Sequence, residues 1–136
     1  MDETPPLPDT STPSKLLRAT VAELHEHGHV KYTFYELGQP EATARKCVMG
    51  AMNWVQAGRA IMFSEELPEP ARLVREAALT AIVDDLHLDP PDYATTGDWR
   101  WITVAEWNNE DDVTPEMIEA ELTQVADLLE AEEADA

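Results

Sequence analysis

Basic side chains are scarce in this chain. Nine Lys and Arg residues stand against 28 Asp and Glu residues among 136, which gives a formal net charge of −19. A surface of that sign repels the phosphates of nucleic acids and of anionic lipid head groups. The basic residues are also scattered along the chain and mostly flanked by acids, so direct nucleic-acid binding is not expected. The charge instead predicts a basic protein as partner.

Cysteine and long apolar runs are equally poorly represented. The lone Cys47 excludes an intramolecular disulfide framework and is typical of a reducing compartment. No stretch approaches the ~20 consecutive apolar residues that a membrane-spanning helix needs. The acidic N-terminus lacks the basic and apolar regions of a secretory signal. We therefore expect a cytoplasmic protein that does not associate with membranes.

The length of the chain is suited to one compact domain. Residues 1–13 contain four prolines and almost no apolar side chains, a composition that does not offset the entropy of ordering. Residues 130–136 are acidic or Ala and carry no apolar stripe. We predict a disordered lead over 1–13, a single globular domain over 14–129 and an acidic tail over 130–136 that frays.

The spacing of apolar residues, together with helix start and stop signals, predicts the main elements. The segment Trp99–Trp107 fits both strand alternation and helical spacing, and a short helix that ends at Asn108 is favoured there. The four main helices are expected over 15–27, from Glu41 or Thr43 to Ala57, over 70–87, and from 115 onward after the capping Thr114.

One segment has the periodicity of a strand. Residues that favour β structure alternate over His29–Leu37, which Gly38 and Pro40 then close. A strand needs a partner, and the candidates are 60–63 and 99–103. The predicted fold class is mostly α, a small irregular four-helix domain with a minor β element, and α+β is the alternative.

Three residues carry packing predictions of their own. Gly50 lies inside the second predicted helix, where Gly costs about 1 kcal/mol relative to Ala, so another helix is expected to approach it closely. On the third predicted helix, Arg75 is placed on the outer face. Leu73, by contrast, belongs to the apolar stripe that faces inward.

Histidine and cysteine supply the weak candidates for metal binding and catalysis. In an extended segment, His25, His27 and His29 would share one face and could converge on a metal ion. They straddle a helix end at Gly28, however, and on a helix His25 and His27 diverge by roughly 200°. Cys47 would need a nearby base to act as a nucleophile, and its apolar neighbours favour a packed core residue. We therefore predict no metal, no cofactor and no catalytic residue, and favour a protein that is not an enzyme.

Tryptophan is abundant for so short a chain, with four residues. Trp residues dominate the hot spots of protein interfaces, and they also cover thin cores. A core role is favoured for Trp54 and Trp107. The acidic turn after the Trp-rich segment lacks the ligand pattern of a calcium loop and is interpreted as solvated. The candidate interaction residues are Trp99, Trp101, Glu110, Asp111 and Asp112.

Two blocks of sequence together carry a family resemblance. One is Cys47-Val-Met-Gly-Ala51 with the helix after it, and the other contains Trp107-Asn108 and is followed by Thr114 and an amphipathic helix. Over residues 15–130 the chain resembles a family of small uncharacterised domains from actinobacteria and their phages. That family has a Cys-x-x-Gly-Ala helix, a Trp-Asn-Asp turn and a Thr-capped final helix, so the resemblance gives a structural motif of Cys47, Gly50, Ala51, Trp107, Asn108 and Thr114.

The chain departs from this family pattern at two places. Asn109 stands where the family usually has Asp, which argues against a metal or acid–base role at this position. Residues 39–45 differ in make-up from the usual lead into the Cys helix. The resemblance implies a similar fold and an actinobacterial or actinophage origin, and it implies no activity.

These observations favour a non-enzymatic, acidic interaction or regulatory protein, encoded by a phage or an accessory gene, that binds a basic host protein. A sharper alternative is a nucleic-acid mimic whose carboxylates occupy the DNA site of a DNA-binding protein. A different class is a small metal-dependent enzyme that uses His25, His27 and His29. A halophile's hydrated surface would also explain the charge. The sequence predicts no particular oligomeric state.

Overall fold

Helices dominate the computed structural model, which describes residues 6–92 and 99–135. The mostly α class is confirmed, and the short helix favoured for Trp99–Asn108 is present. Of the described residues, 29–46 contain only isolated β-bridges. The elements are α1 (Pro13–His27), α2 (Val48–Ala57), the 3-10 helix η1 (Ser64–Glu66), α3 (Glu69–Leu86), α4 (Trp99–Asn109) and α5 (Pro115–Ala134).

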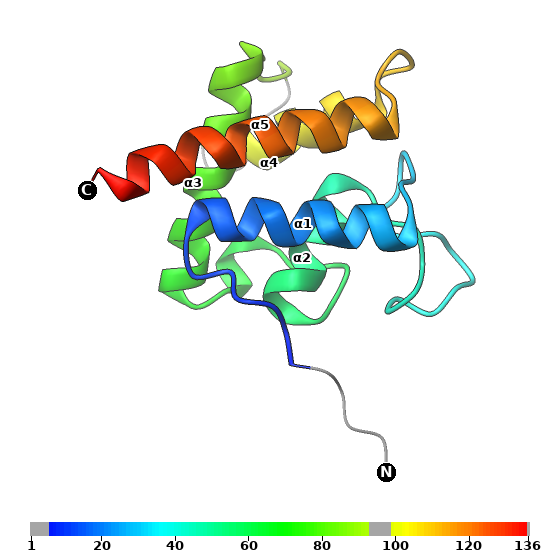
Figure 1. The fold of residues 1–136 in the computed structure, drawn as a ribbon. Helices are drawn as coiled ribbons and strands as arrows, with labels where there is room; N and C mark the ends of the chain where they lie inside the picture. Colours follow the sequence, from blue (N-terminus) through cyan, green and yellow to red (C-terminus); the bar gives the residue numbers. More distant parts are fainter. Residues whose placement is uncertain (1–5, 93–98, 136) are drawn as a thin grey trace.

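The first and last helices lie side by side and antiparallel (Figure 1). Ser14 at the start of α1 donates a 2.6 Å hydrogen bond to Glu133 near the end of α5. Arg18, one turn further along α1, pairs with Glu130 at 2.7 Å. These contacts hold the end of α5, so the prediction that the chain frays from residue 130 is wrong: α5 continues to Ala134.

The core lies where α1 packs against α2, α3 and α5, and α4, which is drawn behind α5 in Figure 1, contacts α2 and α3. Caps fix both ends of α1: the Thr12 hydroxyl accepts from Lys15, and Gly28, with φ +98°, ends the helix as predicted. None of the helices in the described ranges is long and apolar enough to cross a membrane. The largest fully buried apolar side chains are Leu16, Leu17, Val48, Met52, Ile82, Val104, Ile118, Leu122 and Val125.

The segment predicted as a strand is a loop. Val30 N–H donates to Lys46 and Glu36 N–H donates to Arg45, so both ends of the segment bond to the same short stretch of chain. Between them Tyr32 has φ +69°, which turns the backbone and ends any strand. Neither 60–63 nor 99–103 pairs with it. The prediction of a strand over His29–Leu37 is therefore wrong, and the β structure of this segment is limited to two bridges at Lys46.

The second helix is shorter than predicted because Cys47 ends the loop and caps α2 instead of lying inside the helix. Gly50 is close to another segment, as predicted, but that segment is the loop and not a helix. A Cβ atom on Gly50 would overlap the carbonyl oxygen of Phe34. Gly50 therefore lets the 29–46 loop lie directly on the first turn of α2.

Two predictions on α3 are wrong. Arg75, expected outside, is 1% exposed, whereas Leu73, expected inside, is 53% exposed. The guanidinium of Arg75 finds neutral acceptors on α2 and on the 58–67 segment, and these draw it inward. Leu73 lies on a second apolar stripe of α3, described below.

Two predicted segments fall partly beyond the described ranges. Residues 1–5 of the lead over 1–13 and residue 136 of the tail over 130–136 lie outside them. Residues 6–12 carry no helix or strand, and Pro13 already belongs to α1. Disorder of the lead stays a prediction, as does the division into domains.

Candidate functional site

Cys47, the most reactive residue type in the predicted motif, is a structural cap. It is buried, and its sulfur accepts a 3.2 Å hydrogen bond from Gly50 N–H at the start of α2. Burial raises the pKa of the Cys47 thiol, so the nucleophilic thiolate is disfavoured. The geometry gives Cys47 the capping role that Ser or Asp usually has.

Asn108, from the Trp-Asn block, joins three parts of the chain. Its Oδ1 accepts from Val48 N–H at 3.0 Å and lies 2.7 Å from His29 Nε2. Its Nδ2 donates to Asn109 Oδ1. Burial lowers the pKa of His29, so the neutral ring donates its Nε2–H to Asn108. The two predicted motif blocks therefore meet in space as a structural junction between α2, α4 and the loop.

The three histidines do not converge on one point. His25 Nδ1 lies 3.0 Å from Glu119 on α5, and His27 Nε2 lies 3.9 Å from Glu23 on its own helix. His29 bonds to Asn108, as described above. Among the described residues, no group of three or more His, Cys, Asp or Glu side chains could hold a metal ion.

The predicted interaction residues lie at the two ends of α4. Trp101 packs with Phe34 and Phe63, at centroid distances of 6.5 and 6.3 Å, so most of its ring faces inward. Trp99 is half-buried, with the Arg100 guanidinium 4.5 Å from its ring centroid. The turn Glu110–Asp112 follows α4, roughly 15 Å away along the helix axis. The interaction role of these residues stays a prediction, and a single partner would have to span α4 to contact them all.

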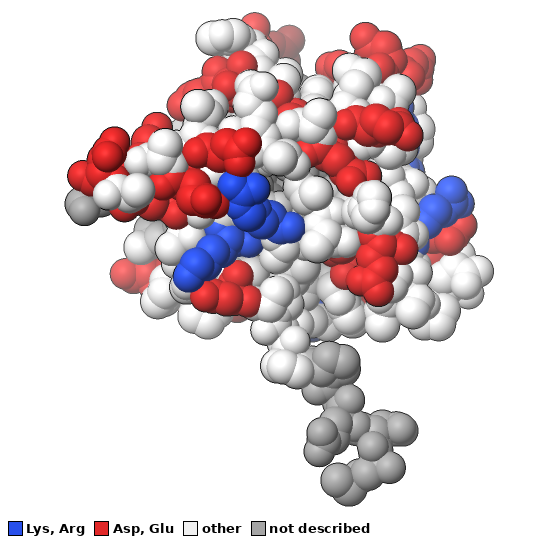
Figure 2. All heavy atoms as spheres, viewed as in Figure 1, with Lys and Arg blue, Asp and Glu red and all other residues white. Residues whose placement is uncertain are grey.

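Most of the few basic residues are either buried or paired with carboxylates of the same chain. Lys46 and Arg75 are buried, at 0% and 1% exposed. Four basic residues on the surface pair with carboxylates, and Figure 2 shows Lys and Arg side chains lying beside Asp and Glu. Those pairs are Lys15 with Asp9, Arg18 with Asp127 and Glu130, Arg45 with Glu36, and Arg72 with Glu69.

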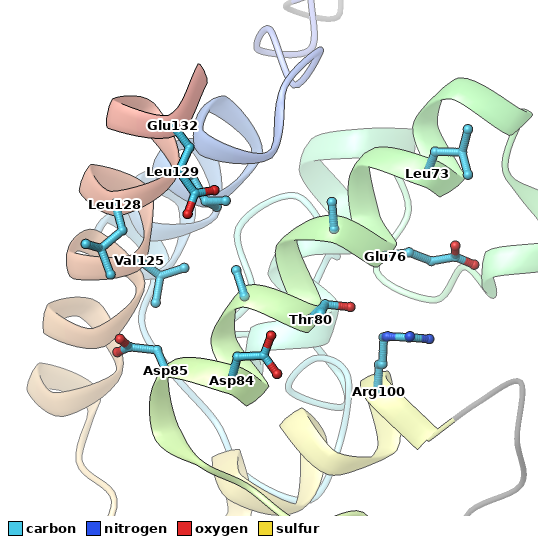
Figure 3. Close-up of a pocket in the computed structure, with 12 residues that line it drawn as sticks. Leu73, Glu76, Thr80, Asp84, Asp85, Arg100, Val125, Leu128, Leu129 and Glu132 are labelled. Carbon is cyan, nitrogen blue, oxygen red and sulfur yellow. The ribbon is translucent and has the colours of Figure 1, made fainter. Parts of the chain in front are cut away.

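An open groove is lined by residues of α3 and α5 and by Arg100 at the start of α4 (Figure 3). Its volume is about 700 Å³. The floor is apolar, and Leu128 is 51% exposed although it is a large apolar side chain. The groove is lined by Leu73, Glu76, Ala77, Thr80, Ala81, Asp84, Asp85, Arg100, Val125, Leu128, Leu129 and Glu132.

The rim of this groove is acidic. Glu76, Asp84 and Asp85 stand on α3 and Glu132 on α5, against the single guanidinium of Arg100 (Figure 3). Acids are so crowded at one end that burial and neighbouring Asp85 raise the pKa of Glu121 to about 8. One Glu121 oxygen is buried with no hydrogen-bond partner in the described structure. The groove is therefore a site that favours positive charge around an apolar centre.

This groove is not predicted above from the sequence, although the sequence carries a signal for it. The apolar stripe read on α3 is too wide for one helix face, because Leu73, Ala77 and Ala81 follow one another at i, i+4 and i+8 beside the truly buried Ala78 and Ile82. On α5, the exposed Leu128 lies beside the stripe of buried residues and widens its apolar face. Each helix thus has a second apolar edge, and the two edges face each other.

Comparison with known proteins identifies the family of the chain but gives no activity. The model of a family of unknown function, DUF6197, matches residues 8–128, and the chain therefore belongs to that family. The chain matches no curated protein and no solved structure. A functional assignment must therefore come from the geometry of the chain itself.

Proposed function

We propose that this member of the family is a non-enzymatic interaction protein, and that the groove between α3 and α5 binds a basic amphipathic helix of a partner protein. The observation that carries the proposal is the combination of an exposed apolar floor with a rim of four carboxylates against one guanidinium. Exposed apolar surface framed by charge is typical of protein-binding sites. The sign of that charge defines the chemistry of the partner.

The shape of the groove favours a helix over an extended peptide. Two helices form its walls, and the described edges of α3 and α5 carry no free strand to which a peptide could add. A helix with Leu at i, i+3 and i+7 would place its apolar face on Ala77, Ala81 and Leu128. Lys or Arg on its flanks would then meet Glu76 and Glu132 on opposite walls.

The apolar contact is tested with a fluorescent peptide of roughly 18 residues made of Leu and Lys in an amphipathic pattern, followed by anisotropy. We expect binding by the native chain and about tenfold weaker binding by Leu128→Asp, because a carboxylate would enter the apolar floor. Met117→Asp is the matched control, since Met117 lies on the same helix outside the groove and is 47% exposed. Equal loss of binding in both variants, or binding of a scrambled peptide as tightly, contradicts the proposal.

The charge contribution is tested by a second matched pair, Asp84→Asn in the groove and Asp111→Asn in the turn after α4. Both substitutions remove one negative charge, so long-range attraction changes equally. We expect Asp84→Asn to weaken peptide binding about threefold and Asp111→Asn to leave it unchanged. A larger loss of binding in Asp111→Asn than in Asp84→Asn would contradict the groove as the site and would favour the predicted patch of Trp99, Trp101 and the acidic turn.

Nucleic-acid mimicry is the competing form of the same proposal. A mimic presents carboxylates in place of phosphates and does not bind through an apolar floor. The affinity of a mimic for its partner would therefore fall steeply with salt, and the Leu128→Asp substitution would not weaken it. An apolar groove predicts the opposite on both counts. The cytoplasm remains the proposed location, and an actinobacterial or phage source remains the proposed origin.

A further inference from the structure

Arg75 is a buried cation without a counter-charge. Its guanidinium donates to Gln56 Oε1 at 2.8 Å, Met62 O at 3.0 Å and Asn53 Oδ1 at 2.6 Å, all of them neutral acceptors. No carboxylate of the described residues pairs with it, and desolvation alone lowers the pKa of Arg75, to about 10. It therefore stays charged at neutral pH.

The other buried cation of the chain is treated differently. Lys46 Nζ lies 2.9 Å from Glu23 Oε2, and both groups are buried together. A buried ion that lacks an opposite charge is strongly disfavoured, and a chain with 28 carboxylates had ample acids to place beside Arg75. A guanidinium has five N–H donors, of which the three acceptors leave two for a further planar anion.

The space beside Arg75 is lined by aromatic rings. Phe34, Phe63 and Trp101 form a cluster with centroid distances of 6.3 to 6.5 Å. Together with Met49, Ser64 and Arg75, they line a small cavity of about 10 Å³. That cavity is too small for a ligand as it stands.

A larger cavity of about 310 Å³ adjoins it and opens under the 29–46 loop. Phe34, Met49 and Trp101 line both spaces and so form the wall between them. Met49 has three flexible side-chain torsions and is the residue that can turn aside with least change elsewhere. With Met49 turned, a molecule in the larger cavity could extend to Arg75.

We propose that the two cavities form one binding site for a small aromatic monocarboxylate. Its ring lies among Phe34, Phe63 and Trp101, and its carboxylate accepts hydrogen bonds from the two remaining N–H groups of Arg75. A bidentate carboxylate fits the planar fork of a guanidinium, and aromatic rings favour edge and offset contacts with one another. The site is separate from the groove between α3 and α5, and neither proposal depends on the other.

The test compares acids with a neutral molecule of the same shape on the native chain. Phenylacetate, benzoate and indole-3-acetate are titrated by calorimetry, with phenylacetamide as the uncharged counterpart of phenylacetate. We expect at least one acid to bind, and phenylacetamide to bind about tenfold more weakly than phenylacetate, because it lacks the charge that Arg75 recognises. Equal binding of acid and amide, or no binding by any of the three acids, overturns the proposal.

A matched pair of variants locates the site. Arg75→Met removes the buried guanidinium, whereas Arg72→Met removes a partly exposed guanidinium from the same helix. We expect Arg75→Met to abolish the preference for acid over amide and Arg72→Met to keep it. If Arg75→Met does not fold, Phe63→Ala decides: Phe63 is 42% exposed, and its loss should weaken every acid that binds the native chain. Unchanged affinity in Phe63→Ala contradicts the proposed position of the ring.

Discussion

The two sides of α5 differ in how far their carboxylates are paired with other groups of the chain. Toward α1 its carboxylates are matched, because Glu133 accepts from Ser14, and Asp127 and Glu130 accept from Arg18. Toward α3 the matching is sparser: Gln124 of α5 donates to Asp85 at 2.9 Å, and four groove carboxylates face one guanidinium over an apolar floor. On the α1 side the carboxylates are paired within the chain. On the α3 side an exposed apolar surface with excess negative charge has the composition of a protein-binding surface.

If this contrast is correct, stability and partner binding should separate by side. Substitutions on the α1 and loop side should lower the free energy of unfolding and leave peptide binding intact in the fraction that folds. Substitutions in the groove should weaken binding and leave unfolding nearly unchanged. Variants on the α1 and loop side test the effect on stability, and the groove variants Leu128→Asp and Asp84→Asn test the effect on binding.

The largest loss is expected from Gly50→Ala. The new methyl group would overlap the Phe34 carbonyl. Because the atoms in conflict belong to the backbone, a side-chain rotation cannot relieve the overlap. We expect the free energy of unfolding, measured in urea, to fall by about 3 kcal/mol. Gly58→Ala is the control at the other end of α2, where the nearest atom is 3.8 Å away and only φ +71° opposes the change. It should cost about 1 kcal/mol. Similar values for the two variants would refute the close approach of the loop.

Removing the buried ion pair should have the next largest effect. Lys46→Met leaves Glu23 buried without its partner, and we expect about 3 kcal/mol of destabilisation or slightly less. The double variant Lys46→Met with Glu23→Gln should recover most of this loss, because no charge is then left buried. A double variant as unstable as the single one would show that Lys46 acts through packing, including its contact with Trp54, and not through charge.

The cap of α5 offers a smaller and local effect. The Thr114 hydroxyl accepts from Met117 N–H, and Thr114→Ala should cost about 1 kcal/mol. Thr123→Ala is the control, since Thr123 is exposed in the middle of the same helix. Thermal unfolding followed by circular dichroism distinguishes the two. A lower melting temperature for Thr123→Ala than for Thr114→Ala would contradict the capping role.

The smallest effect is a pH dependence at the edge of the groove. Folding raises the pKa of Glu121 from 4.5 to about 8, so the folded chain holds a proton that the unfolded chain releases across that window. Stability from this group is full at lower pH and declines as pH rises toward 8. We expect Glu121→Gln to remove about 1 kcal/mol of that decline, a value discounted for partial exposure. Parallel pH profiles for the native chain and the variant would contradict the assignment.

Much of the helical framework could be predicted because its signals are local. Gly28 as a helix end, Thr114 as a cap and the stripe of Ile118 and Leu122 each depend on a few neighbouring residues. The error at residues 29–37 has a physical cause. Alternation in sequence does not supply a strand with a partner, and the left-handed turn at Tyr32 breaks the segment before pairing could extend.

The candidate sites depend on contacts that sequence spacing does not encode. Arg75 looks like a surface residue until Asn53 and Gln56, from another helix, accept its hydrogen bonds. Gly50 signals a close approach but not that Phe34 makes it. The groove exists because α3 and α5 do not pack closely along their facing edges, and the sequence of either helix alone does not predict how the two helices pack. Net charge predicted the sign of the surface and not the place where it gathers around apolar side chains.

The most direct measurement is a map of amide shifts in ¹⁵N-labelled protein titrated with the basic amphipathic peptide. The account predicts that the perturbed amides cluster on the facing edges of α3 and α5, around Ala77, Ala81 and Leu128, with α1 unaffected. Perturbations confined to Trp99, Trp101 and the turn at Glu110–Asp112, or spread evenly over the acidic surface, would contradict it.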